Sequence, residues 1–133
     1  MQGAHFALAL VLALSPLVMS GPALADKAPV WISFGFNVAI EGYDPVAYFT
    51  YSRPDQGSDQ FRLSYQGPEY CSASSTNRDA FKANQARFAP QFGGYCARTV
   101  SQGYTAGVDP NAWAIVGGRL DLNHNKDIQS IWY

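Results

Sequence analysis

One apolar stretch near the start of the chain decides how much of it is available to build a folded domain. Residues Phe6 to Val18 are hydrophobic except for Ser15 and Pro16. A helix needs about 20 residues to cross a bilayer, so this stretch is too short to span one. It is followed by Ala23-Leu24-Ala25, the small-x-small pattern that signal peptidase reads. We therefore expect residues 1–25 to be a cleaved secretory signal peptide and the protein to be periplasmic or secreted.

The first five residues contain no lysine or arginine, which departs from the usual signal peptide. A retained anchor or a misassigned start codon are the alternatives to a cleaved leader. Cleavage would leave about 110 residues, the size of one domain. The formal net charge of −1 excludes nucleic acid as a partner, because phosphate neutralisation needs clustered Lys and Arg. No second apolar stretch is long enough to make a stable membrane span.

The cysteines and histidines limit the possible chemistry. Cys71 and Cys96 both follow the leader, and an oxidising compartment usually joins two such residues in a disulfide. Thiolate and imidazole are also good ligands for Cu(I) and Zn(II). His5 is lost with the leader and only His124 remains, so a multi-histidine metal site within one chain is excluded. A metal site with free thiols and a Cys71–Cys96 disulfide are therefore both open.

The remaining sequence mixes strand and helix patterns. Phe61, Leu63 and Tyr65 alternate with polar residues, which predicts a half-buried strand, and residues 70–73 can return as its hairpin partner. Residues 77–88 then predict a helix that follows the capping candidates Ser74, Ser75 and Thr76 and ends before Pro90. This helix is expected to be the centre of the fold.

Further elements are expected on both sides of the central helix. Residues 114–116 and 119–122 predict a second hairpin around Gly117-Gly118, because glycine tolerates the positive φ angles of tight turns. Asp109-Pro110-Asn111 predicts at most a short helix before Trp113, Asn125 caps another, and residues 30–36 predict a first strand. No internal repeat is visible. The expected class is α+β: small antiparallel hairpins packed on one central helix with short flanking helices.

Several motifs occur in an order typical of one family. They are Gly42-Tyr43-Asp44-Pro45-Val46-Ala47-Tyr48-Phe49, Asn77-Arg78-Asp79-Ala80-Phe81, the run from Phe88 to Ala97, and Asp109-Pro110-Asn111-Ala112-Trp113. With these motifs the chain resembles the exported bacterial branch of the YHS-domain family. The resemblance implies a YHS-like domain over residues 37–133, preceded by an N-terminal extension over residues 26–36.

The resemblance also implies a ligand. YHS domains are presumed to bind metal, with copper as the candidate, through cysteines. In metal-associated relatives one cysteine follows the Asp-Pro-Val segment and another lies before the helix. Here Ala47 stands at the first place, and Cys71 lies slightly upstream of the second. The paired thiolates of those relatives are therefore not reproduced.

Candidate site residues gather around two motifs. Cys96 follows Gly93-Gly94-Tyr95, where the open glycine backbone would let a ligand approach closely. Cys96 with His124, and Cys71 as a further donor, form the candidate copper or zinc site. Tyr43 and Asp44 are candidates to present a phenol and a carboxylate to a ligand; the alternative for Asp44 is a helix cap.

Three classes of function follow from these residues. The first is an exported binding module for a metal ion or a small molecule. The second is a non-catalytic structural or interaction domain, with a protein partner, stabilised by a Cys71–Cys96 disulfide. The third is an enzyme, which ranks last because no nucleophile–base motif or phosphate-binding loop is present.

Overall fold

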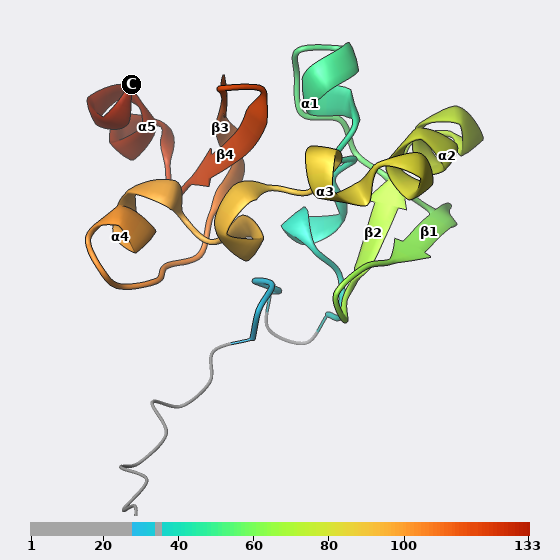
Figure 1. The fold of residues 1–133 in the computed structure, drawn as a ribbon, viewed down its shortest axis with the longest axis horizontal. Helices are drawn as coiled ribbons and strands as arrows, with labels where there is room; N and C mark the ends of the chain where they lie inside the picture. Colours follow the sequence, from blue (N-terminus) through green and yellow to red (C-terminus); the bar gives the residue numbers. More distant parts are fainter. Residues whose placement is uncertain (1–27, 34–35) are drawn as a thin grey trace, which may run out of the picture.

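The computed structural model describes residues 28–33 and 36–133, and the expected signal peptide lies outside this part of the chain. The fold is α+β, as the sequence predicts: two antiparallel β-hairpins are each followed by a helix. Figure 1 shows the hairpins toward opposite ends of the long axis, with the short helix α3 (Gln85–Phe88) between them. Within the described residues, no helix is long and apolar enough to cross a membrane.

The first half of the fold is built around a hairpin whose strands the alternating pattern predicts. Its elements are η1 (Ile40–Gly42), α1 (Ala47–Thr50), β1 (Ser58–Ser64), β2 (Glu69–Ser72) and α2 (Ser75–Ala83). Ser74 caps α2, because its side chain accepts a hydrogen bond from the Asn77 N–H at 3.1 Å. This cap satisfies one of the amides that a helix start leaves unpaired.

The helix predicted at the centre of the fold differs in length and in place, since α2 packs on β1 and β2 of the first hairpin, toward one end of the molecule (Figure 1). The sequence predicts one helix over residues 77–88, but α2 ends at Ala83 and α3 follows as a separate turn. Asn84 breaks the helix with φ −152° and ψ 66°, and asparagine disfavours helix interiors because its side chain competes for backbone hydrogen bonds. After the break, Phe88 meets Phe49 of α1 edge to face at 5.3 Å.

The second half contains another hairpin followed by a helix. Its elements are η2 (Gln91–Gly94), α4 (Ala97–Ser101), β3 (Asp109–Val116), β4 (Arg119–Asn123) and α5 (Lys126–Trp132). The turn at Gly117-Gly118 is confirmed, with φ of 57° and 75°. Asn125 caps α5 by accepting from the Ile128 N–H at 2.8 Å. The short helix predicted at residues 109–111 is wrong, because these residues open β3, where Asp109 pairs with Asn123.

The two halves share one hydrophobic core. Tyr48 of α1 is 1% exposed, donates a hydrogen bond to the Pro110 carbonyl at 2.8 Å, and packs edge to face on Trp113 at 5.3 Å. Burial, mainly, raises the pKa of this phenol above its ordinary value. In the same core, Phe81 of α2 packs against Tyr70 of β2 with ring centroids 4.9 Å apart.

Residues Ala28–Ile32, the N-terminal strap, pack against the second half. The Trp31 N–H donates to the Gly93 carbonyl at 2.8 Å, and the Tyr95 hydroxyl donates to the Ala28 carbonyl at 2.9 Å. Val30 is 3% exposed in the core. The strand predicted at residues 30–36 is reduced, among the described residues, to one isolated bridge between Ile32 and Ala39.

The two hairpins repeat one another, although the sequence shows no repeat. In the first, Ser58 pairs with Ser72 and, after an irregularity in β1, Arg62 pairs with Cys71. In the second, Asp109 pairs with Asn123 and Trp113 with Leu122, so each residue lies 51 positions after its counterpart (58 to 109, 62 to 113, 71 to 122, 72 to 123). The two capping residues, Ser74 and Asn125, follow the same spacing.

A buried carboxyl in β4 makes the stability of the fold depend on pH. Asp121 is 8% exposed, and burial raises its pKa while the hydrogen bond from the Tyr133 hydroxyl, 2.7 Å long, opposes the rise. A raised pKa in the folded state means that the folded protein binds the proton more tightly than the unfolded chain. The stability that this proton contributes is complete below the unfolded pKa and is lost as pH rises through the folded pKa.

We therefore expect Asp121→Asn to raise the melting temperature at pH 7 and to leave it nearly unchanged at pH 3, where the wild-type carboxyl is also neutral. The amide oxygen can still accept from Tyr133. Circular dichroism melts at pH 3, 5 and 7 measure the difference, with Asp79→Asn on the exposed face of α2 as the control. A melting-temperature difference that does not change with pH would contradict this account.

Candidate functional site

The glycine turn at Gly93-Gly94, where the sequence predicts that a ligand can approach, is covered by the N-terminal strap. Gly93 and Gly94 have positive φ angles of 63° and 80°, as expected of an open turn. A Cβ on Gly93 would collide with the Pro29 carbonyl of the strap. The open backbone therefore makes room for the strap, with Tyr95 holding it by the hydrogen bond to Ala28.

Two of the proposed metal donors, Cys96 and His124, contact different residues. Cys96 is fully buried, with its Sγ 4.0 Å from the Asn123 Oδ1, while His124 is exposed and its Nδ1 lies 3.1 Å from the Gly107 carbonyl. Across residues 28–33 and 36–133, no three His, Cys, Asp or Glu side chains form a group that could hold a metal ion. The donors present do not fit the copper or zinc site that the sequence predicts at Cys96, His124 and Cys71.

The disulfide alternative is not formed either. Cys71 in β2 and Cys96 before α4 are both free thiols, and both are buried. The cysteines belong to different halves of the fold: Cys71 to the first hairpin and Cys96 to the second half. Each thiol is buried and packed as a small apolar side chain, Cys96 in the core that the two halves share.

Asp44 holds the first half together rather than facing a ligand. It is fully buried, and its Oδ1 accepts from the N–H groups of Val46 and Ala47 at 2.8 and 3.3 Å. Its Oδ2 accepts from the Ala73 N–H at 2.8 Å and from the Asn77 amide at 2.7 Å. This carboxylate thus supports the start of α1, as the cap interpretation expects, and also ties it to α2.

Tyr43, the neighbour of Asp44, is only partly buried. Its backbone forms an isolated bridge with Gln56, on the approach to β1. Tyr43 therefore contributes a backbone contact to the first half, and the side chain of its neighbour Asp44 is buried in the protein.

A cleft of about 430 Å³ opens on the first half. It lies between the loop that leads into η1 and the β1–β2 hairpin. Its lining residues are Ser33, Phe36, Val38, Glu41, Gly42, Gln56, Gly57, Asp59, Arg62 and Cys71. Of the residues that the sequence marks as site candidates, only Cys71 lines this cleft.

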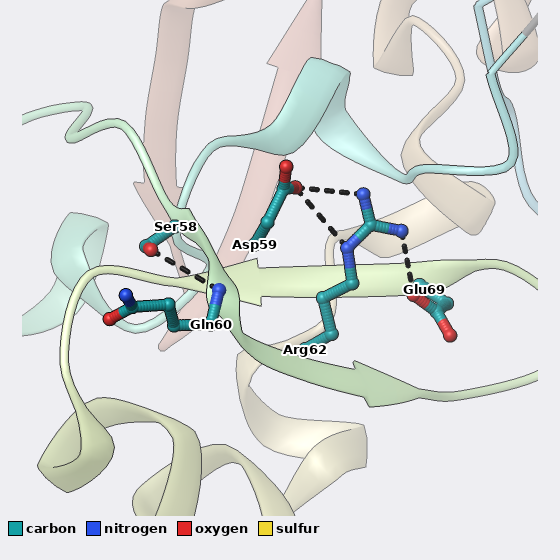
Figure 2. Close-up of polar contacts among 5 residues, drawn as sticks. All are labelled: Ser58, Asp59, Gln60, Arg62 and Glu69. Carbon is teal, nitrogen blue, oxygen red and sulfur yellow. Dashed lines mark hydrogen bonds and ion pairs between the residues drawn. The ribbon is translucent and has the colours of Figure 1, made fainter.

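An irregularity in β1 brings the charged groups of the cleft together. Four steps along β1, from Ser58 to Arg62, match one step along β2, from Ser72 to Cys71. Such bulges redirect side chains, and here Asp59 and Arg62 meet on one side of the hairpin. Figure 2 shows the Arg62 guanidinium between two carboxylates, bonded to Asp59 at 2.7 Å and to Glu69 at 2.8 Å.

These contacts also fix the electrostatics around Arg62. The hydrogen bonds to Glu69 and Asp59 raise the pKa of the guanidinium above its ordinary value, so it stays charged. Its charge is engaged by both partners. Glu41 adds a further carboxylate to the lining, and the Ser33 hydroxyl donates to it at 3.3 Å. The cleft therefore has a net negative lining.

Cys71 lines the cleft, but it is almost fully buried, with 3% of its surface exposed. Burial raises the pKa of its thiol, and the nearby Arg62 opposes the rise only in part. The thiol is therefore mainly protonated at neutral pH, which is the less nucleophilic form. Cys71 contributes shape and polarisability to the cleft rather than a ready nucleophile.

Glu41 is presented by a strained turn. Ile40 and Glu41 have φ angles of 53° and 52°, in the left-handed region that β-branched residues in particular avoid. Gly42 follows with φ 85° and gives its carbonyl to the Gly57 N–H at 2.8 Å. Sequence patterns do not single out Glu41, Gln56, Asp59 or Arg62. The one signal for them is the Glu41-Gly42 pair at the start of the Tyr-Asp-Pro motif.

Searches against family models, curated proteins and solved structures gave no match.

Proposed function

We propose that this chain is an exported binding module of the YHS type and that the cleft on its first half takes a small organic ligand. The order of the motifs from Gly42 to Trp113 supports the family, and the pattern at Ala23-Leu24-Ala25 supports export. The observation that carries the binding function is the cleft itself: its volume of about 430 Å³ lies within the usual range of ligand sites.

The lining favours an organic ligand over a metal ion. Phe36 and Val38 supply apolar surface, while Glu41, Gln56 and Arg62 supply polar groups. Ligand sites typically combine apolar walls with a few polar groups that fix orientation. Copper or zinc would instead need converging thiolate, imidazole or carboxylate donors, and Cys71 is the one thiol in this lining.

The test is a titration followed by amide NMR, with three probes of similar shape: benzylamine, benzyl alcohol and benzoate. We expect at least one to shift the Gly42, Gly57 and Cys71 amides saturably, and to leave Gly103 and Gly118 unchanged. Both control glycines lie in open turns away from the cleft.

A filled cleft should abolish this response. Val38→Trp places a large ring in the lining, whereas Val116→Trp places the same ring at the exposed tip of the second hairpin. We expect saturable shifts in the Val116 variant and none in the Val38 variant, with both folded by circular dichroism. Absence of saturable cleft shifts with all three probes would refute the proposed function.

A further inference from the structure

The repeat in the fold extends from the hairpins to the turns before them. Ile40, Glu41 and Gly42 have φ angles of 53°, 52° and 85°, and Phe92, Gly93 and Gly94 have 58°, 63° and 80°. Tyr43 and Tyr95 follow these two runs, and both are extended, with φ/ψ of −74°/148° and −70°/158°. Such a run is rare outside glycine, so its occurrence at the same place in both halves marks equivalent positions.

Two of these equivalences connect the strap with the cleft. Glu41 corresponds to Gly93 in the paired turns, and Gln56 corresponds to Gly107 at the 51-residue spacing of the hairpins. Both residues of the first half line the cleft. Both glycines of the second half are covered by the strap.

The contacts at the two glycines are close. A Cβ on Gly93 would collide with the Pro29 carbonyl, and one on Gly107 would lie 2.8 Å from the Trp31 ring. The second half therefore accepts a short peptide at the place where the first half has its open cleft. An aromatic ring and a backbone N–H, both from Trp31, make two of the contacts.

We propose that the cleft on the first half binds a short peptide segment of a partner protein, one that carries an aromatic and a basic side chain. The strap is the model for the peptide and its aromatic residue, because it covers the equivalent positions of the second half. This inference rests on the proposed function and names the ligand class of the same cleft.

Charge complementarity supplies the basic residue. The carboxylates of Glu41 and Asp59 line the cleft, while the charge of Arg62 is shared between Asp59 and Glu69. A Lys or Arg in the peptide would compensate the excess of negative charge. Phe36, which is 68% exposed in the lining, offers a ring face for the same cation or for the aromatic side chain.

The experiment uses the peptide acetyl-Lys-Ala-Pro-Val-Trp-Ile-amide, which has the sequence of residues 27–32. Two matched peptides replace its Lys by Glu or its Trp by Ala. Amide NMR of the whole protein follows each titration. We expect saturable shifts of the Gly42, Gly57 and Cys71 amides with the first peptide, and weaker binding with each of the other two.

A pair of protein variants tests the charge. Glu41→Gln is expected to raise the Kd about two- to fivefold, the effect of one partly exposed charge pair. Asp79→Asn, on the exposed face of α2, is expected to leave the Kd unchanged. An equal Kd for the Lys and Glu peptides would overturn the basic residue in the proposal.

The remaining outcomes separate this inference from the proposed function. Shifts at Gly93 and Gly107 in place of the cleft amides would mean that the peptide displaces the strap, and would overturn the inference. Cleft shifts with benzylamine, benzyl alcohol or benzoate but none with the peptide would overturn the peptide ligand and leave the proposed function standing. No cleft shifts with either kind of probe would overturn both.

Discussion

Replacing Asp44 with alanine is expected to lower the free energy of unfolding by about 3–5 kcal/mol, because it breaks a buried hydrogen-bond network. The carboxylate is fully buried and accepts hydrogen bonds from four donors among the described residues. Alanine leaves these donors without an acceptor, and each buried unpaired donor costs about 1–3 kcal/mol. Urea denaturation followed by circular dichroism measures the loss.

Two variants make this result specific. Asp44→Asn keeps one oxygen acceptor but replaces the other by an NH₂ group, so its loss should be smaller than that of alanine yet clear. Asp79→Ala removes an exposed carboxylate that forms an ion pair with the partly buried Arg78, and should change stability by at most about 0.5 kcal/mol. If Asp44→Ala cost no more than Asp79→Ala, the network around Asp44 would not stabilise the fold as described.

Replacing Gly57 with alanine is expected to cost about 2–4 kcal/mol and to distort the cleft, because there is no space for a side chain. A Cβ at this position would lie 2.5 Å from the carbonyl oxygen and 2.6 Å from the Cβ of Cys71. Most of these atoms are backbone of β2 and cannot move without breaking the pairing of the hairpin. Thermal and urea unfolding measure the cost.

Gly67→Ala is the matched control. Gly67 has φ of 112°, but nothing lies within 4 Å of the place where its Cβ would be. Only backbone strain then opposes the substitution, so we expect a loss of about 1 kcal/mol. Equal losses in the two variants would show that contact with Cys71 does not limit position 57.

The parts of the fold that the sequence predicts are those governed by local rules. The alternation around Phe61 and Leu63 predicts β1, the Gly117-Gly118 pair predicts the second hairpin, and Asn125 predicts the start of α5. In each case neighbouring residues supply the pattern, the turn or the cap. The expected helix at residues 109–111 fails because pairing of Asp109 with Asn123 overrides the local preference.

The cleft depends on contacts that local patterns do not encode. The irregularity in β1 brings Asp59 and Arg62 to one side, and it is visible only when the two strands are paired. The repeat is equally hidden: between residues 56–82 and 107–133 the one identical pair at this spacing is Gly67 and Gly118. Alternative side chains satisfy the same backbone geometry, so the shared fold leaves almost no sequence trace.

The strap has a consequence for the order in which the chain folds. Each hairpin joins residues that are close in the sequence, whereas the bond from Tyr95 to Ala28 closes a separation of 67 residues. Closing such a long loop costs more chain entropy, and contacts of this kind form late in folding. The two hairpins can therefore form as local units before the strap closes over the second half of the fold.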